Sequence, residues 1–90
     1  MLEAVKIALR IKNTAFDTEI QDLIDAAKDD LRISGVLVLD EEEPLVKRAI
    51  VLYCKANFGY DNPDADRFAT SYHLLKNHLA LSGEHRESLA

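Results

Sequence analysis

The stretch from Pro44 to Phe58 restricts the fold more than any other part of the sequence. A helix at the surface of a globular protein usually carries an apolar stripe roughly 100° wide, facing the core. Here the apolar residues cover far more than a third of the helix circumference, so the helix must be surrounded by other parts of the chain. We therefore predict a central, buried helix that begins near residues 42–44 and ends near Phe58 and Gly59. Its apolar positions are Val46, Ala49, Ile50, Leu52, Tyr53 and Ala56, with Val51 and Cys54 widening the face.

Three further segments show helical periodicity and can cover this central helix. The first is a short amphipathic helix from Met1 to about Arg10. The second has Asp17 as its N-cap and ends at Ser34 and Gly35, where glycine adopts the left-handed backbone that stops a helix. The third follows the Asn62-Pro63 start signal and runs from about 63 to 81. The apolar stripes are Leu2, Val5, Ala8 and Leu9; Ile20, Leu23, Ile24, Ala27 and Leu31; and Phe68, Tyr72, Leu75 and Leu79.

These segments predict an all-α fold, a four-helix single domain with a central buried third helix. Three Gly and two Pro are too few for the frequent turns of an all-β fold, and 90 residues suit one domain. We expect a helical domain over 1–83, a flexible C-terminal tail over 84–90, and a buried extended linker from Val36 to Leu39. The predicted core consists of Leu23, Ile24, Ala27, Leu31, Leu45, Ala49, Ile50, Tyr53, Phe68, Tyr72 and Leu75.

Charge is banded along the chain, with a net value of −5. Residues 17–43 carry ten acids against Lys28 and Arg32, whereas residues 44–60 carry Lys47, Arg48 and Lys55 and no acid. Such bands are typical of solvated helix faces, and they also suit a subunit whose acidic surface meets the basic surface of a neighbour. The net negative charge disfavours general nucleic-acid binding.

The sequence carries no signal for catalysis, cofactor binding or metal binding. It lacks a glycine-rich phosphate loop, a Gly-x-Ser-x-Gly elbow and a His-Glu-x-x-His pair. His73 and His78 are five residues apart, about 500° around a helix axis, so they do not share a face. Cys54 is expected to be a buried thiol in the central helix. We predict a non-enzymatic protein without metal or cofactor, and the longest uncharged apolar run is too short for a membrane span. The lone cysteine and the lack of a signal-peptide pattern favour the cytosol.

Three stretches together resemble a known protein family. They are the pattern from Phe16 to Ala27, the run from Pro44 to Tyr60 that continues into Asp61-Asn62-Pro63-Asp64, and the segment from Phe68 to Leu81. This combination resembles the small head–tail connector proteins of tailed bacteriophages and prophages, often described as DNA-packaging or head-completion adaptor proteins. The second stretch is the most specific of the three.

The resemblance implies a structural protein whose all-helical subunits form a homo-oligomeric ring beneath the portal. Such a ring would extend the DNA channel, let DNA pass without sequence-specific binding, and support the next head-closure or tail protein. The implied location is the virion neck, and the host cytoplasm during assembly. An alternative is a small helical regulatory module that binds a protein partner. A DNA-reading helix-turn-helix protein is disfavoured, because the second helix is acidic and the third is mostly buried.

Ring assembly predicts particular contact residues. A domain this small cannot hide every apolar residue, so some apolar side chains should stay exposed in the monomer and be covered by neighbouring subunits. Opposite charges would line the rim of the contact, and the C-terminal tail would contact the portal. We expect the isolated chain to be mainly monomeric in dilute solution. The apolar candidates are Leu2, Val5, Val36, Val38 and Leu79, the rim candidates are Asp22, Asp25, Asp29, Lys47 and Arg48, and the portal candidates are Glu84, His85, Arg86 and Leu89.

Overall fold

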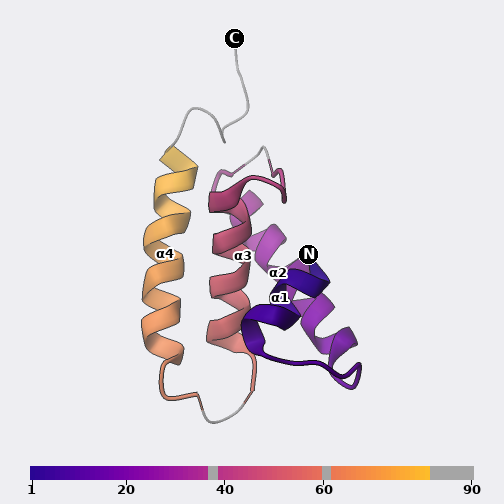
Figure 1. The fold of residues 1–90 in the computed structure, drawn as a ribbon. Coiled ribbons are helices and arrows are strands. Elements are labelled where there is room, and N and C mark those ends of the chain that lie inside the picture. Colours follow the sequence, from indigo (N-terminus) through magenta and orange to yellow (C-terminus); the bar gives the residue numbers. More distant parts are fainter. Residues whose placement is uncertain (37–38, 60–61, 82–90) are drawn as a thin grey trace.

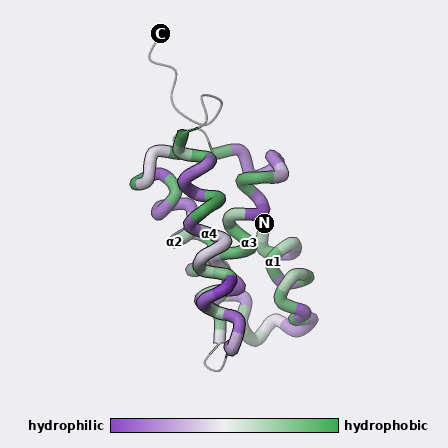
Figure 2. The backbone as a smooth tube through the Cα atoms, turned by 90° about the vertical axis from the view of Figure 1, so that its left-hand side faces the viewer, coloured by the Kyte–Doolittle hydropathy of each residue, from purple (hydrophilic) through white to green (hydrophobic). Residues whose placement is uncertain are grey.

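Helices account for most of the computed structural model, which describes residues 1–36, 39–59 and 62–81. Within these ranges there are no strands, and the helices pack into one domain (Figure 1). Hydrophilic and hydrophobic residues are interleaved along each helix (Figure 2). The predicted all-α, four-helix fold is confirmed, while membership of a ring stays a prediction. The elements are α1 (Leu2–Leu9), α2 (Asp17–Ile33), α3 (Pro44–Asn57) and α4 (Ala65–Leu81).

The third helix is central, as predicted. It packs against each of the other three helices, with α4 along one side and α2 and α1 on the others (Figure 1). Pro44 occupies the first turn of α3, where its missing N–H costs nothing. Val46, Ala49, Ile50 and Cys54 are fully buried, which is the environment that the wide apolar face demands.

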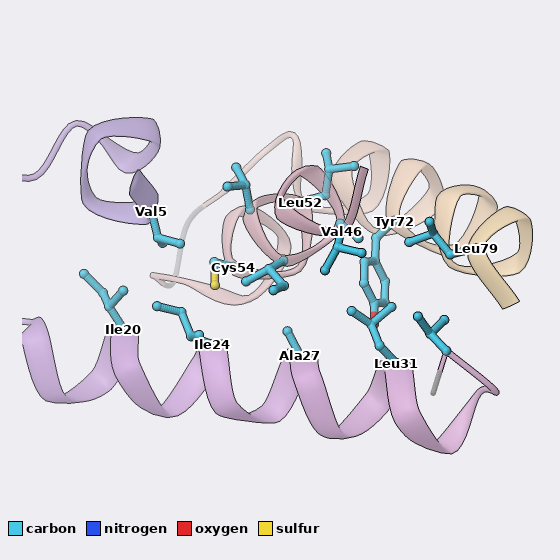
Figure 3. Close-up of a cluster of buried hydrophobic side chains, with 14 residues drawn as sticks. Val5, Ile20, Ile24, Ala27, Leu31, Val46, Leu52, Cys54, Tyr72 and Leu79 are labelled. Carbon is cyan, nitrogen blue, oxygen red and sulfur yellow. The ribbon is translucent and has the colours of Figure 1, made fainter. Parts of the chain in front are cut away.

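One face of α2 forms one side of the hydrophobic core. Ile20, Ile24, Ala27 and Leu31 have no exposed surface, and they point from α2 toward the other helices (Figure 3). Their spacing of three and four residues keeps them on one face of the helix. Gly35 ends the element with a φ of 106°, a left-handed value that glycine adopts without strain. The turn returns the chain to the core, where Val36 is fully buried.

The start of α2 differs from the prediction. Phe16 is the N-cap, and Asp17 is the first helical residue rather than the capping one. The carboxylate of Asp17 instead lies 2.8 Å from the ammonium of Lys6 in α1. Because the Lys6 side chain is only 7% exposed, its charge needs this partner, and the ion pair fixes α1 on the first turn of α2.

Leu45 is a second correction, because it was expected in the core and is 42% exposed. Leu52 lies seven residues further along the same face of α3 and is only 4% exposed. The side of the helix was therefore predicted correctly, but Leu45 lies in the first turn, where the described residues do not cover it.

Of the predicted linker, Val36 is buried and Leu39 is half-buried, and 37–38 lie outside the described residues. None of the helices described is both long and apolar enough to cross a membrane.

Candidate assembly surfaces

The outward side of α2 carries a row of carboxylates. Asp22, Asp25 and Asp29 are exposed and lie opposite the buried row of the same helix. Asp25 Oδ1 accepts a hydrogen bond from Gln21 Nε2 at 3.1 Å, and Asp29 Oδ1 lies 2.9 Å from Arg32 Nη1. We call these three aspartates, with Ile33 at the end of their row, the acidic face of α2. Ile33 is 85% exposed, so an apolar side chain borders the charged row.

A second charged surface lies at the beginning of α3. Lys47 and Arg48 are exposed, and neither forms an ion pair within 1–36, 39–59 and 62–81. Their side chains leave α3 about 100° apart, and we call these two residues the basic patch of α3. All five charged interface candidates are thus on the surface, on two different helices.

The apolar interface candidates behave differently. Val5, Val36 and Leu79 are fully buried, so these three are not among the apolar candidates that stay exposed in the monomer. Val5 reaches from α1 toward Ile20 of α2, and Leu79 continues the buried side of α4 (Figure 3). Leu2 is half-buried against the core. Val5, Val36 and Leu79 thus close the core of one subunit and have no free surface for a neighbour, whereas Leu2 keeps part of its surface exposed.

Some candidates cannot be located in the fold. Val38 of the apolar set and the predicted portal contacts all lie outside the described residues. The division into a helical domain over 1–83 and a tail over 84–90 stays a prediction for the same reason. The portal set is Glu84, His85, Arg86 and Leu89.

The exposed apolar surface is made by residues that the sequence analysis missed. Leu74 is 67% exposed and Leu81 is 78% exposed on the outward side of α4. Such residues can be found in the sequence as apolar residues that lie outside the apolar stripe of their helix. In α2, for example, Ile33 lies about 200° around the helix axis from the buried Leu31. The same reasoning applies to Ile7, which is 75% exposed on α1. The full set of large exposed apolar residues among those described is Ile7, Phe16, Ile33, Leu45, Leu74 and Leu81.

A polar cluster between α2 and α4 was also missed. The Tyr72 hydroxyl donates a hydrogen bond to Asp30 Oδ2 at 2.6 Å, and Lys76 Nζ donates to the same oxygen at 3.1 Å. Burial raises the pKa of Asp30, but the hydrogen bonds from Tyr72 and Lys76, together with the positive charge of Lys76, outweigh it and lower the pKa below its ordinary value. Burial and the bond to Asp30 raise the pKa of Tyr72. We call Asp30, Tyr72 and Lys76 the Asp30 clamp, because they join two helices that otherwise meet mainly through α3.

Reactive groups are scarce in the part of the chain that the structure describes. Cys54 is fully buried as predicted, and burial raises the pKa of its thiol to about 12. The described residues contain no group of three or more His, Cys, Asp or Glu side chains arranged to hold a metal ion. The predicted absence of metal, cofactor and catalysis stays a prediction.

Comparison with known proteins gives one match. The model of a family described as "phage connector protein" matches residues 1–86, a span that includes all four helices. No curated protein and no solved structure matches the chain.

Proposed function

This chain belongs to the phage connector protein family, and we propose that it is a structural head–tail connector of a tailed phage or prophage. In this proposal, copies of the chain form a ring beneath the portal, extend the DNA channel and provide a platform for the next head-closure or tail protein. The observation that carries the proposal is the family match over residues 1–86, because it spans the whole folded domain rather than one helix.

The surfaces of the subunit support an assembly role. The core is closed by residues of all four helices, whereas large apolar side chains such as Ile33, Leu74 and Leu81 remain on the outside. Exposed apolar residues that border charged ones are common where a protein binds another protein. The acidic face of α2 and the basic patch of α3 carry opposite charges on two different helices of the subunit, which suits contacts between subunits.

The net charge is consistent with a channel through which DNA moves. A protein with a net charge of −5 has little general attraction for phosphates, so DNA can slide past it without sequence-specific binding. The proposed partners are the portal, a downstream neck or tail protein and further copies of this chain. Portal contact is assigned to the tail residues Glu84, His85, Arg86 and Leu89, and the proposed location is the virion neck, with assembly in the host cytoplasm.

DNA-filled heads provide the test. Heads would be purified from the encoding phage with this gene deleted, mixed with the purified chain and examined by electron microscopy and by nuclease protection of the packaged DNA. We expect the chain to bind at the single portal vertex and to restore retention of the DNA. Heads assembled without a portal are the control and should not bind it.

Two results would contradict the proposal. One is the absence of binding to portal-bearing heads at micromolar concentration of a folded chain. The other is a compact complex with a protein that is not part of the virion, which would favour the regulatory-module alternative.

A further inference from the structure

We infer that a pocket between α3 and α4 binds an arginine side chain of a partner protein. The pocket has a volume of about 380 Å³, and we call it the α3–α4 pocket. This volume lies within the range of roughly 300–1,000 Å³ that is usual for ligand sites. The inference does not use the connector role, because it is argued from the shape and the polar groups of the pocket alone.

The residues that line the pocket share one face of each helix. α3 and α4 lie side by side (Figure 1). Tyr53, Ala56 and Asn57 lie within about 100° of the circumference of α3, and the lining residues of α4, from Ala65 to His73, lie within about 120°. All of these side chains therefore border a single space. The small side chains of Ala56 and Ala65 leave room that larger residues would fill.

The pocket carries a negative charge that the described chain does not balance. Asp66 forms no ion pair within residues 1–36, 39–59 and 62–81. Asp30 of α2 also lines the pocket, and it pairs with Lys76 at 3.1 Å. With His73 counted as neutral, two carboxylates against one ammonium leave one negative charge. A ligand with a single positive charge therefore complements the pocket.

One cation already binds to this cluster. Lys76 Nζ lies 5.3 Å from the centroid of the Tyr72 ring and donates a hydrogen bond to Asp30 Oδ2. Asp30 Oδ1 and the Tyr53 hydroxyl have no hydrogen-bond partner among the described residues. Burial raises the pKa of Tyr53, and the charge of Asp30 raises it further, so the negative charge acts on the α3 side of the pocket as well. Acceptors thus remain for a second cationic group.

Among cationic side chains, arginine fits these groups best. A guanidinium is planar and has five N–H donors, so it can bind carboxylate and hydroxyl oxygens while it stacks on an aromatic ring. The rings of Tyr53 and Tyr72 meet edge to face, with centroids 5.2 Å apart, and both border the pocket. An ammonium is a compact charge with three donors and would use fewer of the acceptors. Asn57, Asp66 and His73 are exposed, so a side chain can enter from solvent.

Titrations of the ¹⁵N-labelled full chain followed by NMR test the inference. The probe is N-acetyl-arginine amide, in which both main-chain ends are blocked as they are within a protein. We expect saturable changes at the backbone amides of Ala56 and Ala69, with a dissociation constant of about 1 mM. N-acetyl-citrulline amide has nearly the same shape but no charge, and it should bind about tenfold more weakly or less. N-acetyl-lysine amide should bind about threefold more weakly or less.

Two variants and two matched controls locate the binding site. Asp66→Asn removes the unpaired carboxylate and should weaken binding of the arginine probe about threefold to tenfold. Ala69→Leu fills the pocket and should abolish the changes. Asp22→Asn removes an exposed carboxylate of α2, and Ser71→Leu adds the same leucine about 200° around α4 from Ala69. Both controls should bind like the unmodified chain. Circular dichroism melting identifies any variant that does not fold.

Three results would overturn the inference: an arginine probe that binds no better than the citrulline probe, a lysine probe that binds more tightly, or folded Asp66→Asn that binds like the unmodified chain. Free arginine supplies a further arm, because it shares the guanidinium but has a charged main chain. Tighter binding of free arginine than of the blocked probe would assign the pocket to the amino acid itself and remove the partner protein. None of these outcomes affects the binding of the chain to portal-bearing heads, which tests the connector role separately.

Discussion

The aspartates of α2 have different roles according to the side of the helix on which they lie. Asp17 and Asp30 face neighbouring helices, where they pair with Lys6 of α1 and with Tyr72 and Lys76 of α4. The remaining acids point outward. The two inward pairs compensate charges that would be costly near the core, and they fix the helices that flank α2. In the sequence these residues form one acidic band. In the fold, some of them form ion pairs and hydrogen bonds with neighbouring helices, and the others form an exposed acidic surface.

The Asp30 clamp predicts a specific response to acid. The folded-state pKa of Asp30 lies below its ordinary value, so the unfolded chain takes up the proton first as the pH falls. The stabilisation by the ionised carboxylate is therefore fully present above the unfolded pKa, and it is lost as the pH falls through the folded pKa. Urea unfolding of the unmodified chain and of Asp30→Asn, compared at neutral pH and at pH values below the ordinary aspartate pKa, measures this term. We expect the stability of the unmodified chain to fall more steeply.

Two further variants make the result specific. Asp22→Asn removes an exposed carboxylate of the same helix, and its stability should follow the unmodified chain at every pH. Tyr72→Phe removes a hydrogen bond to a charged group and should cost about 1.5–3 kcal/mol at neutral pH. Parallel stability curves for Asp30→Asn and the unmodified chain would show that the carboxylate of Asp30 adds nothing to the fold.

At the scale of elements, helical periodicity predicted much more than the exposure of individual residues. The spacing of apolar residues predicted which segments are helices, the break at Gly35 and the central place of α3. It placed Leu79 on the apolar stripe of its helix, but it could not predict that Leu79 is fully buried while Leu45 is 42% exposed. Burial at a helix end depends on how far the neighbouring helix extends, and periodicity carries no such information. The Asp30 clamp joins residues 42 and 46 positions apart, so only the folded topology brings them together.

The central helix predicts a large effect of one truncation. Ile50 has no exposed surface and lies in the middle of α3, between helices on several sides. Ile50→Ala should cost about 2–5 kcal/mol, because it removes buried methyl groups and leaves a cavity. For a domain of 90 residues this is a large share of the total stability, so we expect a chain that barely folds.

Thermal and urea unfolding followed by circular dichroism measure this cost. Ile33→Ala is the matched control, since it makes the same truncation in a side chain that is 85% exposed. It should change the stability by no more than about 0.5 kcal/mol. A thermal midpoint of Ile50→Ala close to that of the control would show that the packing around α3 tolerates the loss.

At the scale of the whole molecule, the fold separates the residues that stabilise the subunit from those that are free to bind partners. The closed core uses Val5, Val36 and Leu79, three residues expected at the interface, and leaves other apolar residues outside. The outward sides of α2 and α4 and the start of α3 thus remain for neighbours. The sequence predicted that assembly would need uncovered apolar surface, but which residues supply it depends on the packing of all four helices together.

The C-terminal segment provides the test of how a subunit docks on the portal. α4 ends at Leu81, and the proposed portal contacts follow it, so deletion of residues 84–90 removes them while sparing every residue of the four helices. We expect the truncated chain to keep its thermal midpoint and to bind portal-bearing heads about tenfold more weakly or less, measured by co-sedimentation with DNA-filled heads. A chain with the order of residues 84–90 scrambled has the same length and charge, and it should fail in the same way if particular side chains make the contact. Unchanged attachment of a folded, truncated chain would exclude the tail from the interface, and the surfaces of α1 and of residues 35–43 would then be the next to test against the portal.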